Sequence, residues 1–310
     1  IVFFSGSYHG TFDGVLAFPS QKGYGAETQV VGTPEAMMED IMILPYGDEK
    51  SLEIIKGLGD ELAGVLVEPV QSRNPSLQPK EFLQKLRSLT KDLGAVLIFD
   101  EVLLGFRICQ GGAQKYFGVT ADIVTYGKIV GGGMPIGVVA GTKAIMDFVD
   151  GGVWQFGDLS VPRSETTVFQ GTFCKHPLAM AAAHAVLTKM KTDGPVLQEK
   201  VNQLTDNLAM QVNRFFENEK LPIKLSHFGS VFKFDTTGRL NPLLQPIEMD
   251  LFYLLLIEKG VYTWEKRICF LSLAHTQQDV DYFVQKIVET IKELKTHGFL
   301  TDFPPANKSL

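Results

Sequence analysis

The fold is decided by residues 63–102, which read AGVLVEPVQSRNPSLQPKEFLQKLRSLTKDLGAVLIFDEV. The two ends of this stretch, 63–70 and 95–102, are almost continuously apolar, as buried parallel strands are, and do not alternate. Between them, residues 79–94 carry apolar side chains at helical spacing, open at a proline and close at a glycine. The stretch therefore predicts a strand–helix–strand unit, the building block of an α/β fold with a mainly parallel sheet.

Similar apolar runs extend this pattern in both directions. IVFF at residues 1–4 predicts a buried strand, and ADIVTYG at 121–127 and GVVAGT at 137–142 predict two further strands that flank a glycine loop. Because a core strand rarely opens a protein, we expect the chain to be a piece of a longer one.

The pattern changes in the C-terminal third. KLSHFGSVFKFD at 224–235 alternates like an antiparallel strand pair, and Thr276 with Asp279 predicts a capping box for a last helix, 277–296. Further elements of this part are two helices at 177–191 and 195–217, a helix near 248–259 that ends at Gly260, and a strand within 268–276. We predict a large domain over 1–195, a smaller α+β domain over 196–297 and a linker over 298–310.

Composition excludes several classes of function. The chain has 310 residues, of which 45% are hydrophobic and 21% charged, as expected of a globular protein. A net charge of −6 argues against nucleic acid or an anionic membrane as a partner, and no apolar run is long enough to span a bilayer. The three cysteines are odd in number and far apart, which argues against a disulfide framework or a zinc site. A reducing, cytoplasmic compartment and no metal are expected.

Asp100 ends a strongly apolar predicted strand. In open α/β sheets, ligands bind beyond the carboxyl ends of the strands, and a carboxylate there is costly to bury without a cation. Taken alone, Asp100 is equally consistent with a helix cap or with a salt bridge to an arginine such as Arg107.

Lys128 follows the next predicted strand, within TYGKIVGGGMPIG at 125–137. A desolvated lysine has a lowered pKa and attacks carbonyl groups to form Schiff bases, although a lone lysine beside a turn is more often a surface residue. The glycines match neither nucleotide-binding pattern, since the lysine precedes them. Together, Asp100 and Lys128 suit pyridoxal phosphate, whose ring nitrogen an acid would hold and whose C4′ an amine would hold.

At these two motifs the sequence resembles the class III aminotransferases of pyridoxal-phosphate fold type I, in their glutamate-1-semialdehyde aminomutase-like branch. LIFDEVLLGFR at 97–107 and TYGKIVGGGMPIG occur in the family's order and spacing. The resemblance covers nearly the whole chain and implies a large domain with a mainly parallel sheet, an interdomain helix from about 177 and a smaller C-terminal domain. It also implies that the N-terminal part of the family fold, with a phosphate-binding loop, is missing here.

The same resemblance implies the site residues. Lys128 is the Schiff-base residue and Asp100 holds the pyridinium proton. SGSYHG at 5–10 resembles the family's cofactor-facing loop, in which Tyr8 stacks on the ring beside His9, and Val102 packs on the opposite face. The remaining two implied residues are Glu68, on the active-site strand, and Thr172, which binds the cofactor phosphate of a partner subunit in a homodimer.

Two segments resemble a narrower group. FVDGGVWQFGDLSVPRSETTVFQGTF at 148–173 and GVYTWEKRICFLSLAHT at 260–276 are similar to aminotransferase domains of hybrid polyketide–nonribosomal peptide synthetases of the microcystin or nodularin type in cyanobacteria. The resemblance implies an amino acid donor such as glutamate, a keto acceptor tethered to a carrier protein, and neighbouring synthetase domains.

The sequence departs from ornithine- and GABA-type relatives at three positions. Arg73 and Cys269 stand where those enzymes bind substrate carboxylates, and Leu103 replaces a glutamine near the cofactor. The residue that binds the donor carboxylate therefore stays unassigned, and Arg73 is consistent with a carboxylate, a carrier phosphate or solvent. Two alternatives remain open, an aminomutase that moves an amine within one molecule and an inactive domain that only dimerises.

Overall fold

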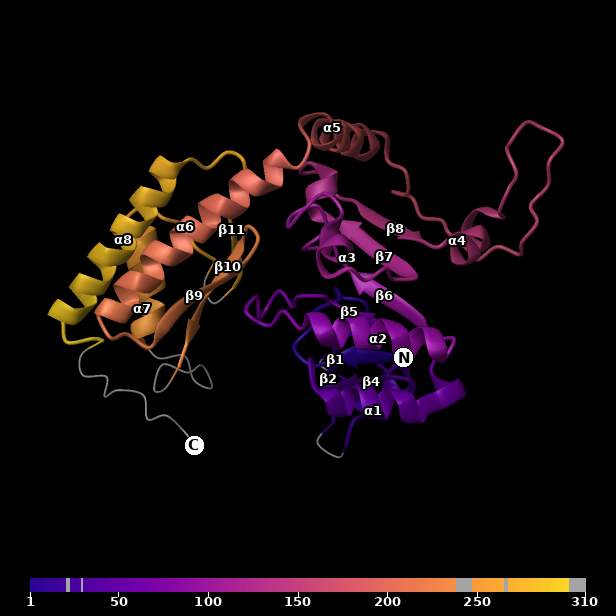
Figure 1. Cartoon of the computed structure of the whole chain (residues 1–310), viewed down its shortest axis with the longest axis horizontal. Helices are drawn as coiled ribbons and strands as arrows, with labels where there is room; N and C mark the ends of the chain where they lie inside the picture. Colours follow the sequence, from indigo (N-terminus) through magenta and orange to yellow (C-terminus); the bar gives the residue numbers. More distant parts are fainter. Residues whose placement is uncertain (21–22, 29, 238–246, 265–266, 301–310) are drawn as a thin grey trace. The chain divides into compact units, whose positions relative to one another are not determined.

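A computed structural model describes the chain as two compact units (Figure 1). The described residues are 1–20, 23–28, 30–237, 247–264 and 267–300. The first unit comprises Ile1–Ser72 and Leu77–Pro195, and the second comprises Arg73–Ser76 together with the chain from Val196 onward. None of the helices in these described ranges has the length and apolar character that a membrane crossing needs.

A six-stranded sheet forms the centre of the first unit, in the order β4-β1-β5-β6-β7-β8. Every neighbouring pair is parallel except β7 and β8, which are antiparallel, so the prediction of a mainly parallel sheet is confirmed. The strands are β1 (Val2–Phe4), β4 (Met42–Leu44), β5 (Gly64–Val67), β6 (Val96–Asp100), β7 (Ile123–Gly127) and β8 (Gly137–Gly141).

Helix α2 (Lys80–Asp92) completes the predicted strand–helix–strand unit between β5 and β6. Its apolar positions Phe82, Leu83 and Leu86 are buried, and the Phe82 ring lies 5.5 Å from that of Phe4 on β1. Burial of apolar side chains of this size stabilises a fold by about 1.5–3 kcal/mol each. The other elements of this unit are α1 (Glu49–Leu58), α3 (Gly112–Phe117), α4 (Lys143–Asp150), α5 (Pro177–Asp193), the hairpin β2 (Ala17–Pro19) with β3 (Ala26–Thr28), and the 3₁₀ turns η1 (Asp13–Val15), η2 (Glu35–Met38), η3 (Gly59–Glu61) and η4 (Lys128–Gly131).

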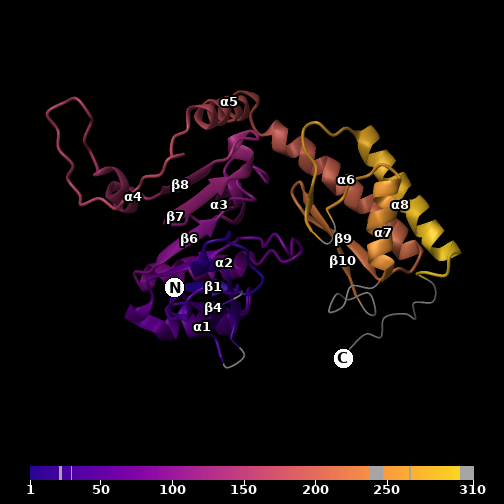
Figure 2. The same cartoon turned by 180° about the vertical axis from the view of Figure 1, so that it is seen from behind.

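The second unit has a three-stranded antiparallel sheet in the order β11-β10-β9, with three helices gathered on one side of it (Figures 1 and 2). The predicted strand pair near 224–235 is confirmed, whereas the strand predicted within 268–276 is only two residues long. The elements are α6 (Val196–Asn218), β9 (Ile223–Phe228), β10 (Val231–Thr236), α7 (Ile247–Glu258), β11 (Cys269–Phe270) and α8 (Gln277–Thr296).

A core of its own holds the second unit together. Phe232 and Phe234 on β10 meet aromatic rings of α7 and α8, with centroids 5.2–6.4 Å apart. At the start of α8, Thr276 accepts a hydrogen bond from the Asp279 amide while the Asp279 carboxylate accepts one from the Thr276 amide, which confirms the predicted capping box.

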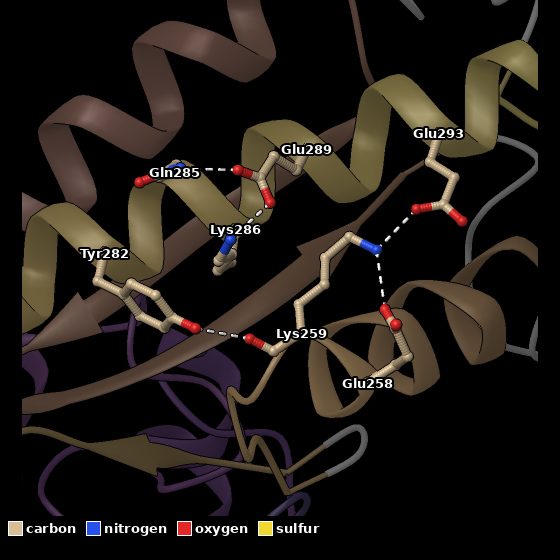
Figure 3. A network of polar contacts seen from close by, with 7 residues as sticks. All are labelled: Glu258, Lys259, Tyr282, Gln285, Lys286, Glu289 and Glu293. Carbon is tan, nitrogen blue, oxygen red and sulfur yellow. Dashed lines mark hydrogen bonds and ion pairs between the residues drawn. The ribbon is translucent and has the colours of Figure 1, made fainter.

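Lys259, the residue after α7, connects that helix to α8 (Figure 3). Its ammonium group donates to Glu293 at 2.7 Å and Glu258 at 3.1 Å, and its carbonyl accepts from the Tyr282 hydroxyl at 2.8 Å. Of the segment predicted as a linker, residues 298–300 pack on this unit, where Leu300 is buried, and 301–310 lie outside the described residues.

Candidate active site

Asp100 and Lys128 lie at the same edge of the sheet in the first unit. The parallel register of β6 and β7 sets Asp100 opposite Thr125, and Lys128 follows at the end of β7, where η4 begins. Lys128 has a φ of 46°, a left-handed conformation that costs a non-glycine residue about 1–3 kcal/mol. Residues held in such conformations cluster at functional sites, so this strain marks the turn as a candidate site.

Three hydrogen bonds hold the Asp100 carboxylate, whose side chain is only 12% exposed. Nδ1 of His9 lies 2.8 Å from Oδ2, while the Val102 amide and the Thr125 hydroxyl donate to Oδ1 at 3.1 and 3.3 Å. Among the described residues, His9 is therefore the basic side chain that lies against Asp100. The Arg107 Nε donates to the Leu103 carbonyl at 3.2 Å.

His9 is largely enclosed, with 4% of its side chain exposed. Its ring lies 5.7 Å from the Phe3 ring, and its Nε2 is buried with no hydrogen-bond partner in the described part of the chain. Burying a polar nitrogen without a hydrogen-bond partner is energetically unfavourable. Such unpaired groups occur at sites where a ligand supplies the missing partner.

Lys128 combines access to solvent with partial desolvation. Burial lowers the pKa of its amine, the negative charges of Asp100 and Glu68 raise it, and the Arg107 guanidinium lowers it further. The net direction is downward, so more of the amine is neutral near neutral pH than in an ordinary lysine. A neutral, accessible amine is the form that attacks a carbonyl carbon.

Glu68 fixes the loop that carries His9. Its buried carboxylate accepts hydrogen bonds from the Tyr8 amide at 3.0 Å and the Ser72 amide at 3.4 Å. Burial raises the pKa of Glu68, these amides and His9 lower it, and Asp100 raises it. Gln71 holds the same loop by donating to the Ser5 carbonyl at 2.7 Å, a contact that no pattern in the sequence indicates.

Val102 and Tyr8 lie beside these polar groups. A Cβ at Gly127 would come within 3.3 Å of a Val102 methyl group, so Val102 lies against the residue before Lys128. Tyr8 keeps 44% of its surface exposed next to His9. Thr172 is exposed in a turn before α5, and within the described ranges no hydrogen bond or ion pair joins it to Asp100 or Lys128.

Gly132, among the glycines after Lys128, allows α5 to pack closely. Gly132 has a φ of 56°, and a Cβ there would lie 2.8 Å from a Val186 methyl group on that helix. A side chain would therefore push the turn that begins at Lys128 away from α5.

The three positions at which the sequence departs from ornithine- and GABA-type enzymes lie in different units. Leu103 is buried in the first unit near the site. Arg73 and Cys269 belong to the second unit, and Arg73 is exposed.

Comparison with known proteins shows the family of the chain. Residues 1–291 match the family described as aminotransferase class-III. A glutamate-1-semialdehyde 2,1-aminomutase of Archaeoglobus fulgidus is 33% identical over 306 residues, which cover 94% of this chain and 68% of the relative. A glutamate-1-semialdehyde 2,1-aminomutase of Staphylococcus aureus strain MW2 is 35% identical over 301 residues, which cover 92% of this chain and 66% of the relative. The chain thus spans about two thirds of these relatives' lengths.

Solved structures of transaminases share the fold. One, described as a transaminase with PLP bound, superposes with a TM-score of 0.83 at 26% identity and covers 96% of this chain and 68% of its own. An omega-transaminase from Sphaerobacter thermophilus gives the same TM-score at 28% identity, covering 95% of this chain and 68% of its own.

Proposed function

The chain belongs to the class III aminotransferases, and from that premise we propose that it transfers amino groups with pyridoxal phosphate, using Lys128 and Asp100 as catalytic residues. One observation carries this proposal. A mostly buried carboxylate, held by His9, ends one strand, and a lysine of lowered pKa follows the next strand at the same edge of the sheet. The cofactor needs an acid at its ring nitrogen and an amine at its carbonyl carbon, and this donor set supplies both.

The chain's own residues divide the work as follows. Asp100 would hold the proton of the ring nitrogen, Lys128 would hold C4′, and Tyr8 and Val102 would lie against the two faces of the ring. When bound, the cofactor supplies an electron sink for the substrate carbon. The Lys128 amine would be the base that holds and moves the proton at the substrate carbon. His9 and Glu68 keep Asp100 and the Tyr8 loop in place for these steps.

A homodimer is part of the proposal. The segment between α4 and α5 exposes large apolar side chains that a second copy would cover, as large exposed apolar patches on soluble proteins mark interaction sites. Thr172 lies in this segment and would bind the cofactor phosphate of the partner subunit. Among the exposed residues are Val153, Phe156, Leu159, Val161, Val168, Phe169 and Phe173.

The acceptor we propose is a β-keto acyl chain tethered to a carrier domain, with an amino acid such as glutamate as donor. The support is the similarity of residues 148–173 and 260–276 to aminotransferase domains of polyketide–nonribosomal peptide synthetases. A second candidate is an aminomutase of the glutamate-1-semialdehyde type, because relatives of 33% and 35% identity carry that name.

Attachment of the cofactor tests the role of Lys128. Purified protein is mixed with pyridoxal phosphate, treated with borohydride to make the attachment permanent, and digested for mass spectrometry. We expect the label on Lys128, retained in Lys143→Ala and absent from Lys128→Ala. Lys143 is a suitable control because it is an exposed lysine paired with Asp147 on α4. Labelling that is equal in all three proteins would overturn the proposal.

The substrate is tested separately. Glutamate is supplied as donor with a β-keto acyl thioester of a carrier protein as acceptor, and the aminated product is followed by mass spectrometry. In a parallel reaction, glutamate-1-semialdehyde is supplied without a donor. Product from the first reaction alone supports the carrier-tethered acceptor, whereas product from the second alone supports the aminomutase.

A further inference from the structure

Glu101, the residue after Asp100, is a fully buried carboxylate that the proposed chemistry does not use. Its Oε2 accepts a hydrogen bond from the Ala113 amide at 2.6 Å, and its Oε1 accepts one from the Gln114 amide at 3.1 Å. No lysine, arginine or histidine pairs with it in the part of the chain that the structure describes. Burying a carboxylate without a cation costs folding free energy. Its position beside the candidate site therefore suggests that Glu101 has a functional role.

The loop from Glu101 to Gly112 closes around this carboxylate. At one end the Gly105 amide donates to the Glu101 carbonyl at 2.8 Å, and at the other end the side chain meets the start of α3. Gly112 has a φ of 62°, and a Cβ there would lie 2.1 Å from Oε2, so only glycine fits. The loop carries Val102, which lies against Gly127, and Arg107, whose guanidinium lowers the pKa of Lys128.

Hydrogen bonds continue from α3 to the strand that leads into Lys128. The Gln114 side chain accepts from the Ala121 amide at 3.0 Å and donates to the Tyr126 hydroxyl at 3.3 Å. The Tyr126 ring lies 5.2 Å from the Phe106 ring, which belongs to the same loop. A second framework, separate from the His9 contact, thus joins the neighbour of Asp100 to Tyr126, just before Lys128.

We propose that Glu101 is a positioning residue for amino transfer, which fixes Asp100 and Lys128 relative to one another through Gln114 and Tyr126. The inference rests on the proposed roles of Asp100 and Lys128. Both oxygens of an ionised carboxylate accept hydrogen bonds, whereas a protonated one presents an O–H group to one of the two amides. The framework is therefore complete only when Glu101 is ionised.

Glu101 changes its ionisation state within the pH range that kinetic experiments can reach. Burial raises its pKa to about 7, the two amides lower it, and the charge of Asp100 raises it. The other titratable group that faces it is Tyr126 on β7, whose own pKa burial and Glu101 raise. Positioning by Glu101 thus weakens as the pH falls below about 7, and Glu101→Gln imitates the protonated side chain at every pH.

Kinetics across pH test this assignment. In the pyridoxal-phosphate-loaded protein, Glu101→Gln is expected to lower kcat about tenfold at about pH 8, with little change in KM for the donor, because one charged hydrogen bond is lost. The ratio of wild-type to variant kcat should fall towards one at about pH 6. Gln84→Leu, which removes a bond to the Phe117 carbonyl at the other end of α3, should show no loss. A ratio that does not change with pH would overturn the proposal.

A measurement on the cofactor-free protein is independent of activity. Hydrogen exchange of the segment 101–117 should be faster in Glu101→Gln than in Gln84→Leu at about pH 8, and the two should become similar at about pH 6. If Glu101→Gln does not fold, Tyr126→Phe tests the far end of the framework and should lower kcat without changing KM. An unchanged kcat in folded Tyr126→Phe, or unchanged exchange in Glu101→Gln, contradicts the inference.

The two proposals fail in different ways. If borohydride labelling does not depend on Lys128, the proposed function fails and this inference fails with it. If Lys128 is labelled but the kcat ratio is flat across pH, only the role of Glu101 is overturned.

Discussion

His9 and His227 each lie 2.8 Å from an aspartate oxygen, yet their surroundings differ. The His9 and Asp100 side chains are 4% and 12% exposed, whereas those of His227 and Asp206 are 31% and 65% exposed. Solvent screens the second pair, and surface pairs of this kind contribute about 0–1 kcal/mol. The buried pair has no such screening, so removing one partner leaves the other charge poorly compensated.

Replacing His9 should therefore lower the rate of amino transfer. His9→Phe keeps a ring against Phe3 and removes a hydrogen bond to the Asp100 carboxylate. Such bonds to charged groups contribute about 1.5–3 kcal/mol, so kcat/KM for amino transfer should fall about 10- to 100-fold. Steady-state kinetics of the loaded protein measure this, with His227→Phe as a control that should retain wild-type kcat/KM. A loss of twofold or less in His9→Phe would disprove it.

The raised pKa of Glu101 also predicts how stability depends on pH. Because its folded-state pKa of about 7 exceeds the ordinary 4.5, the folded protein binds a proton more tightly than the unfolded one. The resulting stabilisation is fully present below about pH 4.5 and is lost as the pH rises through about 7, a change of about 3 kcal/mol at 1.36 kcal/mol per pKa unit.

Urea unfolding at a series of pH values measures that change. Burial raises the pKa of Glu68 in the same direction, so the wild-type slope includes both groups. Subtracting the curve of Glu101→Gln isolates the part that belongs to Glu101. Parallel curves for the two proteins would show that Glu101 has an ordinary pKa.

At the scale of elements, strong periodic signals were predictable and short elements were not. The apolar runs that became β5 and β6 and the spacing of α2 identified the sheet, and the Asp100–Lys128 pair followed from two neighbouring strand ends. Helix α3 has only six residues, and its position depends on the Glu101 carboxylate, a contact that no local pattern indicates. The antiparallel direction of β8 beside β7 was likewise not predictable, because an apolar run does not indicate whether a strand pairs in parallel or antiparallel.

The capping box of α8 allows a test at this scale. Thr276→Ala removes the hydroxyl that accepts from the Asp279 amide, and loss of such a cap costs about 1 kcal/mol. Thr142→Ala at the start of α4 is a matched control, because the Thr142 side chain makes no capping hydrogen bond. Chemical denaturation should show the loss in Thr276→Ala alone. Equal losses in both variants would mean that the alanine substitution itself, and not the cap, is responsible.

At the scale of the whole molecule, the candidate site and the second core belong to different units. Asp100, Lys128, His9 and Glu68 all lie in the first unit, whereas the aromatic cluster around Phe234 lies in the second. A ligand stabilises what it binds and leaves unchanged whatever unfolds independently of it. Because the site lies in the first unit, the cofactor is expected to stabilise that unit.

Pyridoxal phosphate should raise the stability of the first unit selectively. At about 100 times its dissociation constant, a ligand adds about 2.7 kcal/mol to the part that binds it. Hydrogen exchange resolves the two units, so protection should increase in segments of β6 and β7 and stay unchanged in β10 and α8. Thr276→Ala should produce the opposite pattern, with faster exchange in the second unit only. Lys128→Ala weakens the attachment and should reduce the cofactor's effect on β6 and β7. Equal protection of both units by the cofactor would instead show that they unfold together, since the free energy of binding would then stabilise the second core as well as the first.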